Sequence, residues 1–311
     1  MINESYLYRR KKESFFLSFF RFLRKSTKIA LLLIIIGGSL LVSYQMFKGE
    51  AGVKTPLVSS NQIEGWTTTT KKQPPPPKRT ADEAKRAALL AKLNPILKVN
   101  SQYSVSVIDL GIGDSFGINE TEQFHAASLM KVLVATAVFE EIERGKLSLS
   151  TQLGSYDVQF QLKQMINQSN NTSWDYFNNL LGWDREQETA TRFELSGTRI
   201  WGNLMTTADA AKLLKLHEDG AAIAEVHRDL LFSYMQNTET EDRITPVIPA
   251  EVKVYHKTGT FEAGIHDAAI VKHPRNPFIL VVFTNGGATN QIRIKSIQDA
   301  AREVYAYFDS L

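Results

Sequence analysis

The chain has 311 residues, of which 43% are hydrophobic and 22% are charged, and it contains no cysteine. This length allows one large domain or two small ones, and the apolar share is sufficient for a packed core. The lack of cysteine excludes disulfide scaffolds, zinc sites with cysteine ligands, iron–sulfur clusters, thiol nucleophiles and a lipid-modified N-terminal cysteine. It does not exclude secretion.

The formal net charge of +3 is the sum of two regions with opposite charge. Residues 1–80 contain 14 lysines and arginines against 4 acidic residues, whereas residues 81–311 contain 22 against 29. The basic excess is therefore confined to the N-terminal region, and the rest of the chain is mildly acidic. This distribution argues against a uniformly basic nucleic-acid-binding protein.

The segment from Ile29 to Phe47 contains 19 residues without a charge. As a helix it would be about 28 Å long, which is enough to cross a bilayer core once. Eight basic residues precede it: Arg9, Arg10, Lys11, Lys12, Arg21, Arg24, Lys25 and Lys28. Because positively charged flanks stay on the cytoplasmic side, we expect a cytoplasmic basic tail over 1–28, a transmembrane helix over 29–47, and an extracytoplasmic location for the rest.

Two features of this N-terminal region allow a second interpretation. A cleaved signal peptide is the alternative to an anchor, although the apolar run exceeds a usual h-region and residues 43–48 offer no small-x-small cleavage site. The phenylalanines between Phe15 and Phe22 are compatible with an amphipathic helix on the inner leaflet and equally with a disordered basic tail.

Residues 48–80 have the composition of a spacer. They contain the runs Thr67–Thr70 and Pro74–Pro77 and too few large apolar residues to form a core, which predicts an extended, semi-rigid extracytoplasmic segment. Thr80 and Glu83 then match a capping box, and leucines follow at helical spacing. We therefore place the start of the folded domain, residues 81–311, at this point.

The domain has a clear order of predicted elements. Alternating apolar residues predict two strands, near 103–107 and 116–118, joined by a glycine-rich turn. Further along, the patterns predict helices at 126–143, 160–166, 175–181 and 207–217, strands at 252–257, 267–271 and 278–284, and a last helix at 292–308. This order predicts an antiparallel sheet covered by the terminal helices, with a helical insertion.

Ser128 and Lys131 lie in the first turn of the predicted helix 126–143. A spacing of three residues places the hydroxyl and the amine on one helical face, within reach of each other. A serine hydroxyl becomes a strong nucleophile when a neighbouring base takes its proton, and a partly desolvated lysine can be that base. Backbone N–H groups at the helix start can stabilise the anion formed on an attacked carbonyl. Alone, this S-x-x-K pattern is weak evidence, because a serine near a helix start is usually a cap.

Two further motifs make the pattern specific. Ser169-Asn170-Asn171 begins 41 positions after Ser128, and Lys257-Thr258-Gly259-Thr260 ends a predicted late strand. In this order and with these separations, the three stretches resemble the motifs of the penicillin-recognising serine hydrolases, and those of class A β-lactamases in particular. The resemblance covers about residues 84–311. It implies an α+β fold with α/β/α layers, in which terminal helices flank a five-stranded antiparallel sheet and an all-helical subdomain is inserted, here preceded by the transmembrane helix.

The resemblance also implies catalytic roles. Ser128 would be acylated, Lys131 would act as base or proton relay, and Ser169 would pass a proton to the leaving nitrogen. Asn171 would bind a substrate amide and orient Lys131. These roles follow from the matched motifs as a set, because each residue alone has an ordinary structural explanation.

Substrate binding would involve the third motif. Lys257 and Thr258 would hold the substrate carboxylate, and Gly259 would leave room for the substrate backbone. The backbone N–H groups of Ser128 and Thr260 would form the oxyanion hole.

One departure from the family pattern concerns deacylation. Class A enzymes carry a glutamate on a long loop, where it activates the water that hydrolyses the acyl-enzyme. Here only 23 residues separate Gly182 from Thr206, and they contain no E-x-x-L-N motif. Glu194 is the candidate for this role, followed by Glu186 and Glu188, and an exposed loop acid without function is the alternative. The sequence therefore supports acylation better than deacylation.

Three functions are consistent with these motifs. The first is a membrane-anchored β-lactamase that uses a Ser128 acyl-enzyme, and the second is a D,D-carboxypeptidase-like or cell-wall peptide hydrolase that releases β-lactams slowly. The third is a non-catalytic penicillin- or wall-binding sensor module. The expected partners are a β-lactam or an acyl-D-Ala-D-Ala peptide, and the cell membrane through residues 29–47. We expect no cofactor and no metal, because the six histidines lack metal-binding spacing and are typical of surface or strand-end positions.

Overall fold

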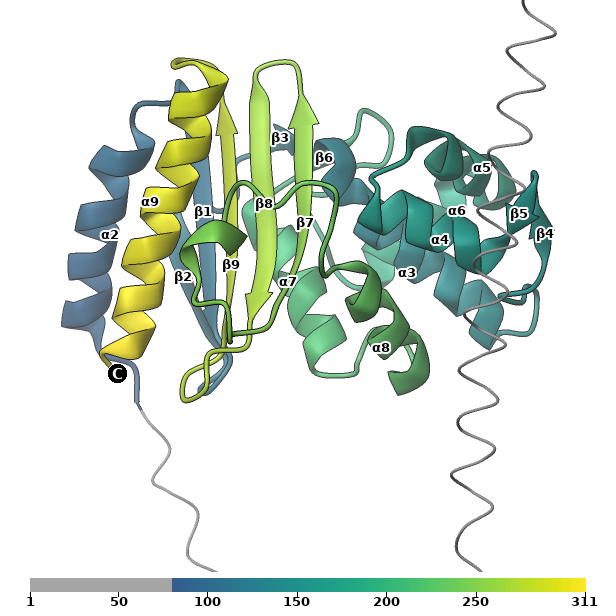
Figure 1. Cartoon of the computed structure of the whole chain (residues 1–311), viewed down its shortest axis with the longest axis horizontal. Helices are drawn as coiled ribbons and strands as arrows, with labels where there is room; N and C mark the ends of the chain where they lie inside the picture. The colour runs from purple at the N-terminus through teal and green to yellow at the C-terminus, as the bar shows by residue number, and fades with distance from the viewer. Residues whose placement is uncertain (1–79) are drawn as a thin grey trace, which may run out of the picture. The chain divides into compact units, whose positions relative to one another are not determined.

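A five-stranded antiparallel sheet lies at the centre of the part of the chain that the computed structural model describes, residues 80–311 (Figure 1). The strands are β1 (Gln102–Asp109), β2 (Asp114–Ile118), β7 (Val254–Phe261), β8 (Gly264–Val271) and β9 (Phe278–Asn285). Their spatial order is β2-β1-β9-β8-β7, and every neighbouring pair is antiparallel. The first two strands of the chain therefore pair with the last three, which places β7 at an edge.

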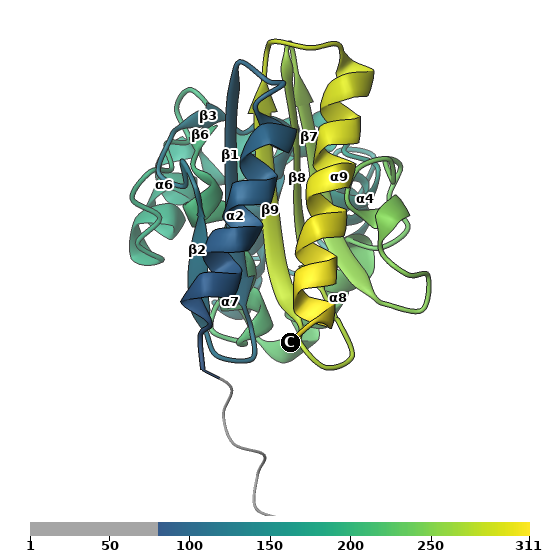
Figure 2. The ribbon, with the colours of Figure 1, turned by 90° about the vertical axis from the view of Figure 1, so that its left-hand side faces the viewer.

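Helices cover both faces of this sheet. Helices α2 (Glu83–Leu97) and α9 (Asn290–Asp309) lie side by side across one face (Figure 2). The other helices are η1 (Ala127–Leu129), α3 (Met130–Glu143), α4 (Val158–Asn167), α5 (Asn171–Leu181), α6 (Trp183–Arg192), α7 (Thr207–Glu218), α8 (Glu225–Tyr234) and η2 (Thr245–Val247). This arrangement confirms the predicted α+β fold with a five-stranded antiparallel sheet between helices.

The strand β9 shows why the sheet is buried on both faces. Its residues from Phe278 to Phe283 are all apolar and fully buried. Because side chains alternate across a strand, Phe278, Leu280 and Val282 pack toward α2 and α9, whereas Ile279, Val281 and Phe283 join the core around α3. A continuous apolar run is the expected sequence of a strand between two helical layers.

The helical insertion is less regular than predicted. It contains a two-stranded pair, β4 (Gln152–Leu153) with β5 (Tyr156–Asp157), so it is not all-helical. A second pair joins β3 (Phe124–His125) to β6 (Leu204–Met205), which ties the residues before the Ser128 turn to the end of the insertion.

Helix α6 was expected as part of a loop, and α8 was also not predicted. The sequence of α6 contains few apolar residues, so hydrophobic periodicity gave no signal. Polar contacts hold it instead: the guanidinium of Arg185 donates to Glu140 at 2.6 Å and to Glu141 at 2.8 Å on α3. Thr189 Oγ1 also donates to Glu140 at 3.1 Å.

Two predicted boundaries change in the structure. Asp82, rather than Thr80, caps α2, because its carboxylate accepts the N–H of Lys85 at 3.0 Å. The strand that was expected to end at Lys257 continues to Phe261, so the third motif lies inside β7. The predicted basic tail, transmembrane helix and spacer lie outside the described residues. Within 80–311, no helix is both long enough and apolar enough to cross a membrane.

Candidate active site

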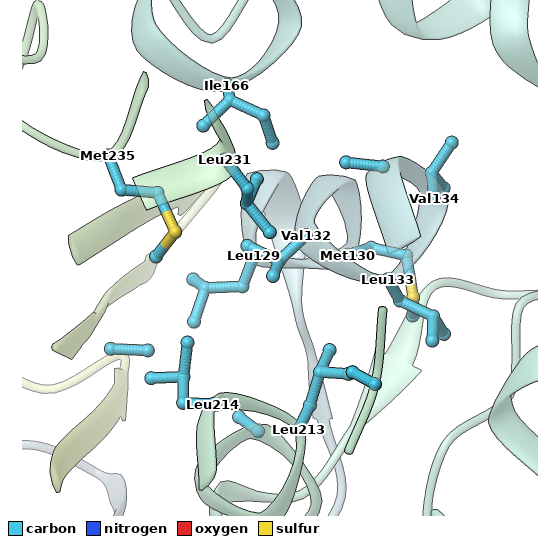
Figure 3. Close-up of a cluster of buried hydrophobic side chains, with 14 of the residues drawn as sticks. Leu129, Met130, Val132, Leu133, Val134, Ile166, Leu213, Leu214, Leu231 and Met235 are labelled. Carbon is cyan, nitrogen blue, oxygen red and sulfur yellow. The ribbon is translucent and has the colours of Figure 1, made fainter. Parts of the chain in front are cut away.

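Ser128 lies directly before the most deeply buried helix of the described domain. It belongs to the short η1 turn, and α3 follows directly. The start of α3 is enclosed by apolar residues from several elements (Figure 3), namely Ile166, Leu213, Leu214, Leu231 and Met235. Ser128 itself is half-buried, so a fixed helix presents a hydroxyl that a substrate can reach.

The turn that carries Ser128 is strained and pinned. Ala127 has a φ of 52°, a left-handed conformation that is uncommon for a residue with a Cβ atom. The N–H of Ala126 donates to Asn203 O at 2.7 Å, and Asn203 Nδ2 donates to Ala127 O at 3.2 Å. The sequence did not predict this role of Asn203, because its partner lies 76 positions away and no local pattern indicates the contact.

Lys131 is fully buried, with no exposed surface. Its Nζ donates to Ser169 O at 2.6 Å and to Asn171 Oδ1 at 2.7 Å, so the structure joins the first motif to the second as predicted. The ring of Trp174 lies 4.9 Å from the same nitrogen. Burial lowers the pKa of Lys131 to about 8, which makes the neutral amine accessible near neutral pH.

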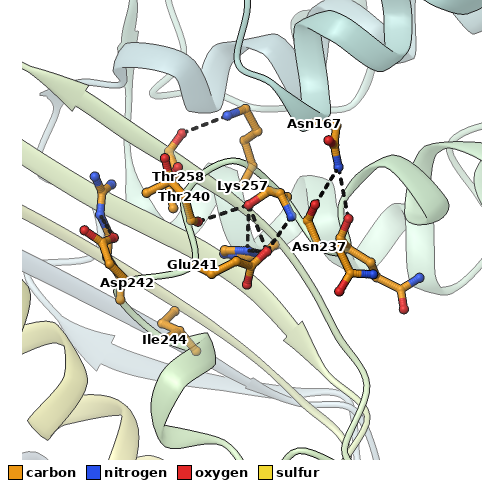
Figure 4. Close-up of polar contacts among 12 residues, drawn as sticks. Asn167, Asn237, Thr240, Glu241, Asp242, Ile244, Lys257 and Thr258 are labelled. Atoms are coloured by element: carbon orange, nitrogen blue, oxygen red, sulfur yellow. Dashed lines mark hydrogen bonds and ion pairs between the residues drawn. The ribbon is translucent and has the colours of Figure 1, made fainter. Parts of the chain in front are cut away.

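The second motif forms the sharp turn before α5. Ser169 has a φ of 52°, and the side chain of Asn170 caps α5 by accepting the N–H of Ser173 at 2.9 Å. Asn167 anchors the turn from behind, because its Nδ2 donates to carbonyl oxygens of the 234–237 segment (Figure 4). These bonds connect this segment to the residues directly before the second motif.

Lys257 reaches the same place from the sheet. Its Nζ donates to Ser169 Oγ at 2.9 Å, so Ser169 contacts Lys131 through its carbonyl and Lys257 through its hydroxyl. Lys257 is 2% exposed, and burial together with the like charge of Lys131 lowers its pKa to about 7. The structure thus brings Lys131, Ser169, Asn171 and Lys257 into one polar cluster beside Ser128.

The open edge of β7 faces this cluster. The N–H of His256 points away from β8, because it donates to Met235 O at 2.9 Å. Backbone N–H groups alternate between the two edges of a strand, so those of Thr258 and Thr260 point to the same open edge. Thr258 is buried and Thr260 is exposed at the end of the edge. The direction of the Thr260 N–H is therefore compatible with the expected role of an oxyanion-hole donor.

Gly259 allows β7 to approach the nucleophile turn. A Cβ atom at this position would lie 2.5 Å from Leu129 Cδ1 and 2.9 Å from Ala126 O, both in the turn around Ser128. We therefore expect Gly259→Ala to displace this turn and to lower the acylation rate by a penicillin at least tenfold. Stopped-flow acylation and thermal unfolding of the variant check this, and a wild-type rate with a wild-type Tm would contradict it.

A network of buried charged residues contacts β7. The sequence did not predict this network. Arg243 is 4% exposed, and its guanidinium donates to Gly259 O at 2.8 Å and to Thr260 Oγ1 at 2.6 Å. His256 lies between Asp267, 3.0 Å from Nδ1, and Glu241, 3.1 Å from Nε2. Burial opposes the charge of His256, but the two carboxylates raise its pKa to about 9.

The expectation of surface or strand-end histidines is therefore wrong for His256. It is also wrong for His217 and His266. Both are buried, and burial lowers the pKa of each to about 3. Lone histidines and arginines in the sequence give no sign of such long-range partners.

Within residues 80–311, none of the three candidate glutamates has a hydrogen bond or an ion pair to the cluster around Lys131. Glu194 has an 85% exposed side chain, and its Oε2 is 3.0 Å from Lys212 Nζ. Glu188 is exposed on α6, 3.5 Å from Arg185. Glu186 is also on α6, where burial raises its pKa to about 7 and leaves Oε1 without a hydrogen-bond partner. Glu186 and Glu188 are thus helical residues and not loop acids.

Comparison with known proteins identifies the family. A family model described as the β-lactamase enzyme family matches residues 88–308, which include all three motifs. The chain belongs to this family. It is thus a β-lactamase-like serine hydrolase, as the three motifs predicted.

Individual relatives of this β-lactamase family member are distant. The β-lactamase VEB-1 of Pseudomonas aeruginosa is 23% identical over 269 residues, which covers 71% of this chain and 90% of the relative. A class A β-lactamase described as the last common ancestor of Gram-negative bacteria has a TM-score of 0.68 and 23% identity, covering 71% of this chain and 99% of that one. PBP-A has a TM-score of 0.67 and 20% identity, covering 72% and 97%. These structures share the fold.

Proposed function

We propose that this chain is a membrane-anchored serine hydrolase of the class A β-lactamase type, which opens β-lactam amides through an acyl-enzyme on Ser128. The observation that carries the proposal is the polar cluster beside Ser128. In it, Lys131 Nζ is buried and bonded to Ser169 O and Asn171 Oδ1, while Lys257 Nζ is bonded to Ser169 Oγ. A PBP-A variant that shares this fold is described as an acyl-enzyme complex with penicillin-G.

Acylation begins with proton removal from Ser128. Lys131 is three residues further along, and its lowered pKa supplies a neutral amine that can take the proton while Oγ attacks the lactam carbonyl carbon. The leaving nitrogen then needs a proton. We infer that Ser169 gives its hydroxyl proton to this nitrogen and regains one from Lys131, so that the proton of Ser128 ends on the lactam nitrogen. The contacts of Ser169 with Lys257 Nζ through its hydroxyl and with Lys131 Nζ through its carbonyl oxygen support this role.

The third motif binds the substrate in this scheme. Lys257 and Thr258 hold the carboxylate of the β-lactam, and Gly259 lets the substrate lie along the open edge of β7. The N–H groups of Ser128 and Thr260 stabilise the oxyanion, while Asn171 binds the substrate amide. Arg243 fixes the strand at Gly259 and Thr260 and thereby holds this surface in place.

A second candidate function is a hydrolase of acyl-D-Ala-D-Ala wall peptides that is acylated by β-lactams and releases them slowly. The position of Glu194 favours it, because this carboxylate is exposed and bonded to Lys212. In the β-lactamase function, Glu194 is the candidate that the sequence suggested for the deacylating base. The choice between the two functions therefore depends on the rate of deacylation.

A time course of intact mass with penicillin-G tests the proposal. We expect the protein to gain the mass of the antibiotic within seconds and then to lose it as the hydrolysed product is released. Many turnovers per minute support the β-lactamase function, and a persistent stoichiometric adduct supports the peptide hydrolase. Absence of any adduct would contradict both and leave a non-catalytic wall-binding module.

We also propose that residues 29–47 anchor the protein in the cell membrane, with the N-terminus in the cytoplasm and the catalytic domain outside. The uncharged apolar run and its basic flank support this topology. The full chain should stay in the membrane fraction after alkaline carbonate washing, and deletion of residues 1–47 should release it. Recovery of a shortened mature chain from the medium would instead support a cleaved signal peptide.

A further inference from the structure

A carboxylate outside the three motifs borders the buried lysine. Asp175 lies on α5 four residues after Asn171, and residues at this spacing share one helical face. Asn171 Oδ1 accepts a hydrogen bond from Lys131 Nζ at 2.7 Å, so the N-terminal end of this face of α5 contacts the lysine amine. Burial lowers the pKa of Lys131, and the negative charge of Asp175 acts against this lowering. The helical spacing places Asp175 one turn from the residue that contacts this amine, and the effect of its charge on Lys131 agrees with that position.

Among the described residues, Asp175 differs from Glu186 and Glu194 in being both exposed and without a hydrogen-bond or ion-pair partner. Within residues 80–311 it has no hydrogen bond and no ion pair. Glu194, by contrast, is bonded to Lys212, and Glu186 is buried in α6 away from solvent. A base that activates water must be ionised, open to water and close to the acyl group. Asp175 combines solvent access with a position one helical turn from a residue that contacts Lys131.

The short connection between α6 and β6 does not cover Asp175, which is exposed. Loop residues bond to the domain instead of to α5: Thr198 Oγ1 donates to Asp209 at 2.7 Å, and Asn203 bonds to the turn of Ser128. Asp175 therefore stays exposed on a rigid helix. Sites on helices hold their groups more exactly in place than sites on loops do.

We propose that Asp175 is the general base that activates water for hydrolysis of the Ser128 acyl-enzyme, an inference that rests on the function proposed above. Asp175 takes one proton from a water molecule, whose oxygen then bonds to the ester carbonyl carbon. The bond from this carbon to Ser128 Oγ breaks, and the proton returns to Oγ through Lys131 Nζ. One water is consumed, and the products are the opened acid and free Ser128.

The test separates acylation from deacylation in Asp175→Asn, which keeps the shape of the side chain and removes its charge. Full-length protein is mixed with penicillin-G, the excess is removed, and the adduct is followed by intact mass. We expect adduct formation at the wild-type rate and adduct loss slowed by about 10²–10⁴-fold, the usual contribution of a general base. Asp184→Asn, an exposed aspartate on the adjacent helix α6, is the matched control and should behave as wild type.

Three outcomes would overturn the inference. The first is loss of the adduct from Asp175→Asn at the wild-type rate, and the second is slow loss from Glu194→Gln with fast loss from Asp175→Asn. The third is a wild-type adduct that persists, which would mean that the protein has no deacylating base while the proposed acylation stands. Failure of the wild type to form an adduct would instead overturn the proposed function itself. Partial recovery of adduct loss in Asp175→Glu would further support a carboxylate base.

Discussion

Ser128→Ala should form no covalent adduct with penicillin-G, and its turnover of a chromogenic cephalosporin should fall by a factor on the order of 10⁶. The hydroxyl is the group that would carry the acyl chain, and it stands half-buried on a turn fixed by Asn203. Alanine removes only the hydroxyl and leaves the η1 turn unchanged. Thermal unfolding should therefore give a Tm close to that of the wild type.

Ser115→Ala is a suitable control for this prediction. Ser115 is an exposed serine on β2, the strand at the opposite edge of the sheet from β7. Its variant should be labelled and should turn over substrate as the wild type does. Equal labelling of the wild type and Ser128→Ala would show that the nucleophile is another residue.

Lys131→Met should lower the second-order rate of acylation by about 10²–10⁴-fold, the usual contribution of a general base. Methionine fills a similar volume without a charge. The variant should stay folded, because burial disfavours the protonated lysine. The cost to the folded state grows as the pH falls below 10.5 and is complete below about pH 8. Stopped-flow acylation and thermal unfolding at pH 7 measure the two effects, with the exposed Lys163→Met on α4 as control.

The pH profile of acylation should distinguish a base from a structural lysine. Lys131 must be neutral to take a proton, and its pKa is lowered to about 8, so the rate should rise with pH on the acid side. Lys257 must be charged to hold a carboxylate, and its pKa is lowered to about 7, so the rate should fall on the alkaline side. The two limbs belong to the coupled pair. In Lys131→Met the rising limb should disappear, and an unchanged bell-shaped profile would contradict the assignment of Lys131.

Local sequence patterns were sufficient for most of the sheet and for the buried helix α3. Strands such as β9 have continuous apolar runs, and the leucines and valines of α3 recur at helical spacing, so short windows of sequence carry the signal. Helix α6 gave no such signal, because its contacts to Glu140 and Glu141 are polar and come from another part of the chain. Family membership was predictable because three short motifs recur in a fixed order.

The sequence by itself identified the proposed nucleophile Ser128 and its proposed base Lys131, since the two are three residues apart on consecutive helical turns and no distant contact is needed to bring them together. It also identified Ser169 and Lys257, through their motifs. Only the tertiary structure decided how these groups behave. The lowered pKa of Lys131 arises from burial by several elements, and the open position of Asp175 depends on a loop that bonds elsewhere. Burial and exposure are sums over contacts between distant segments, so no window of sequence contains them.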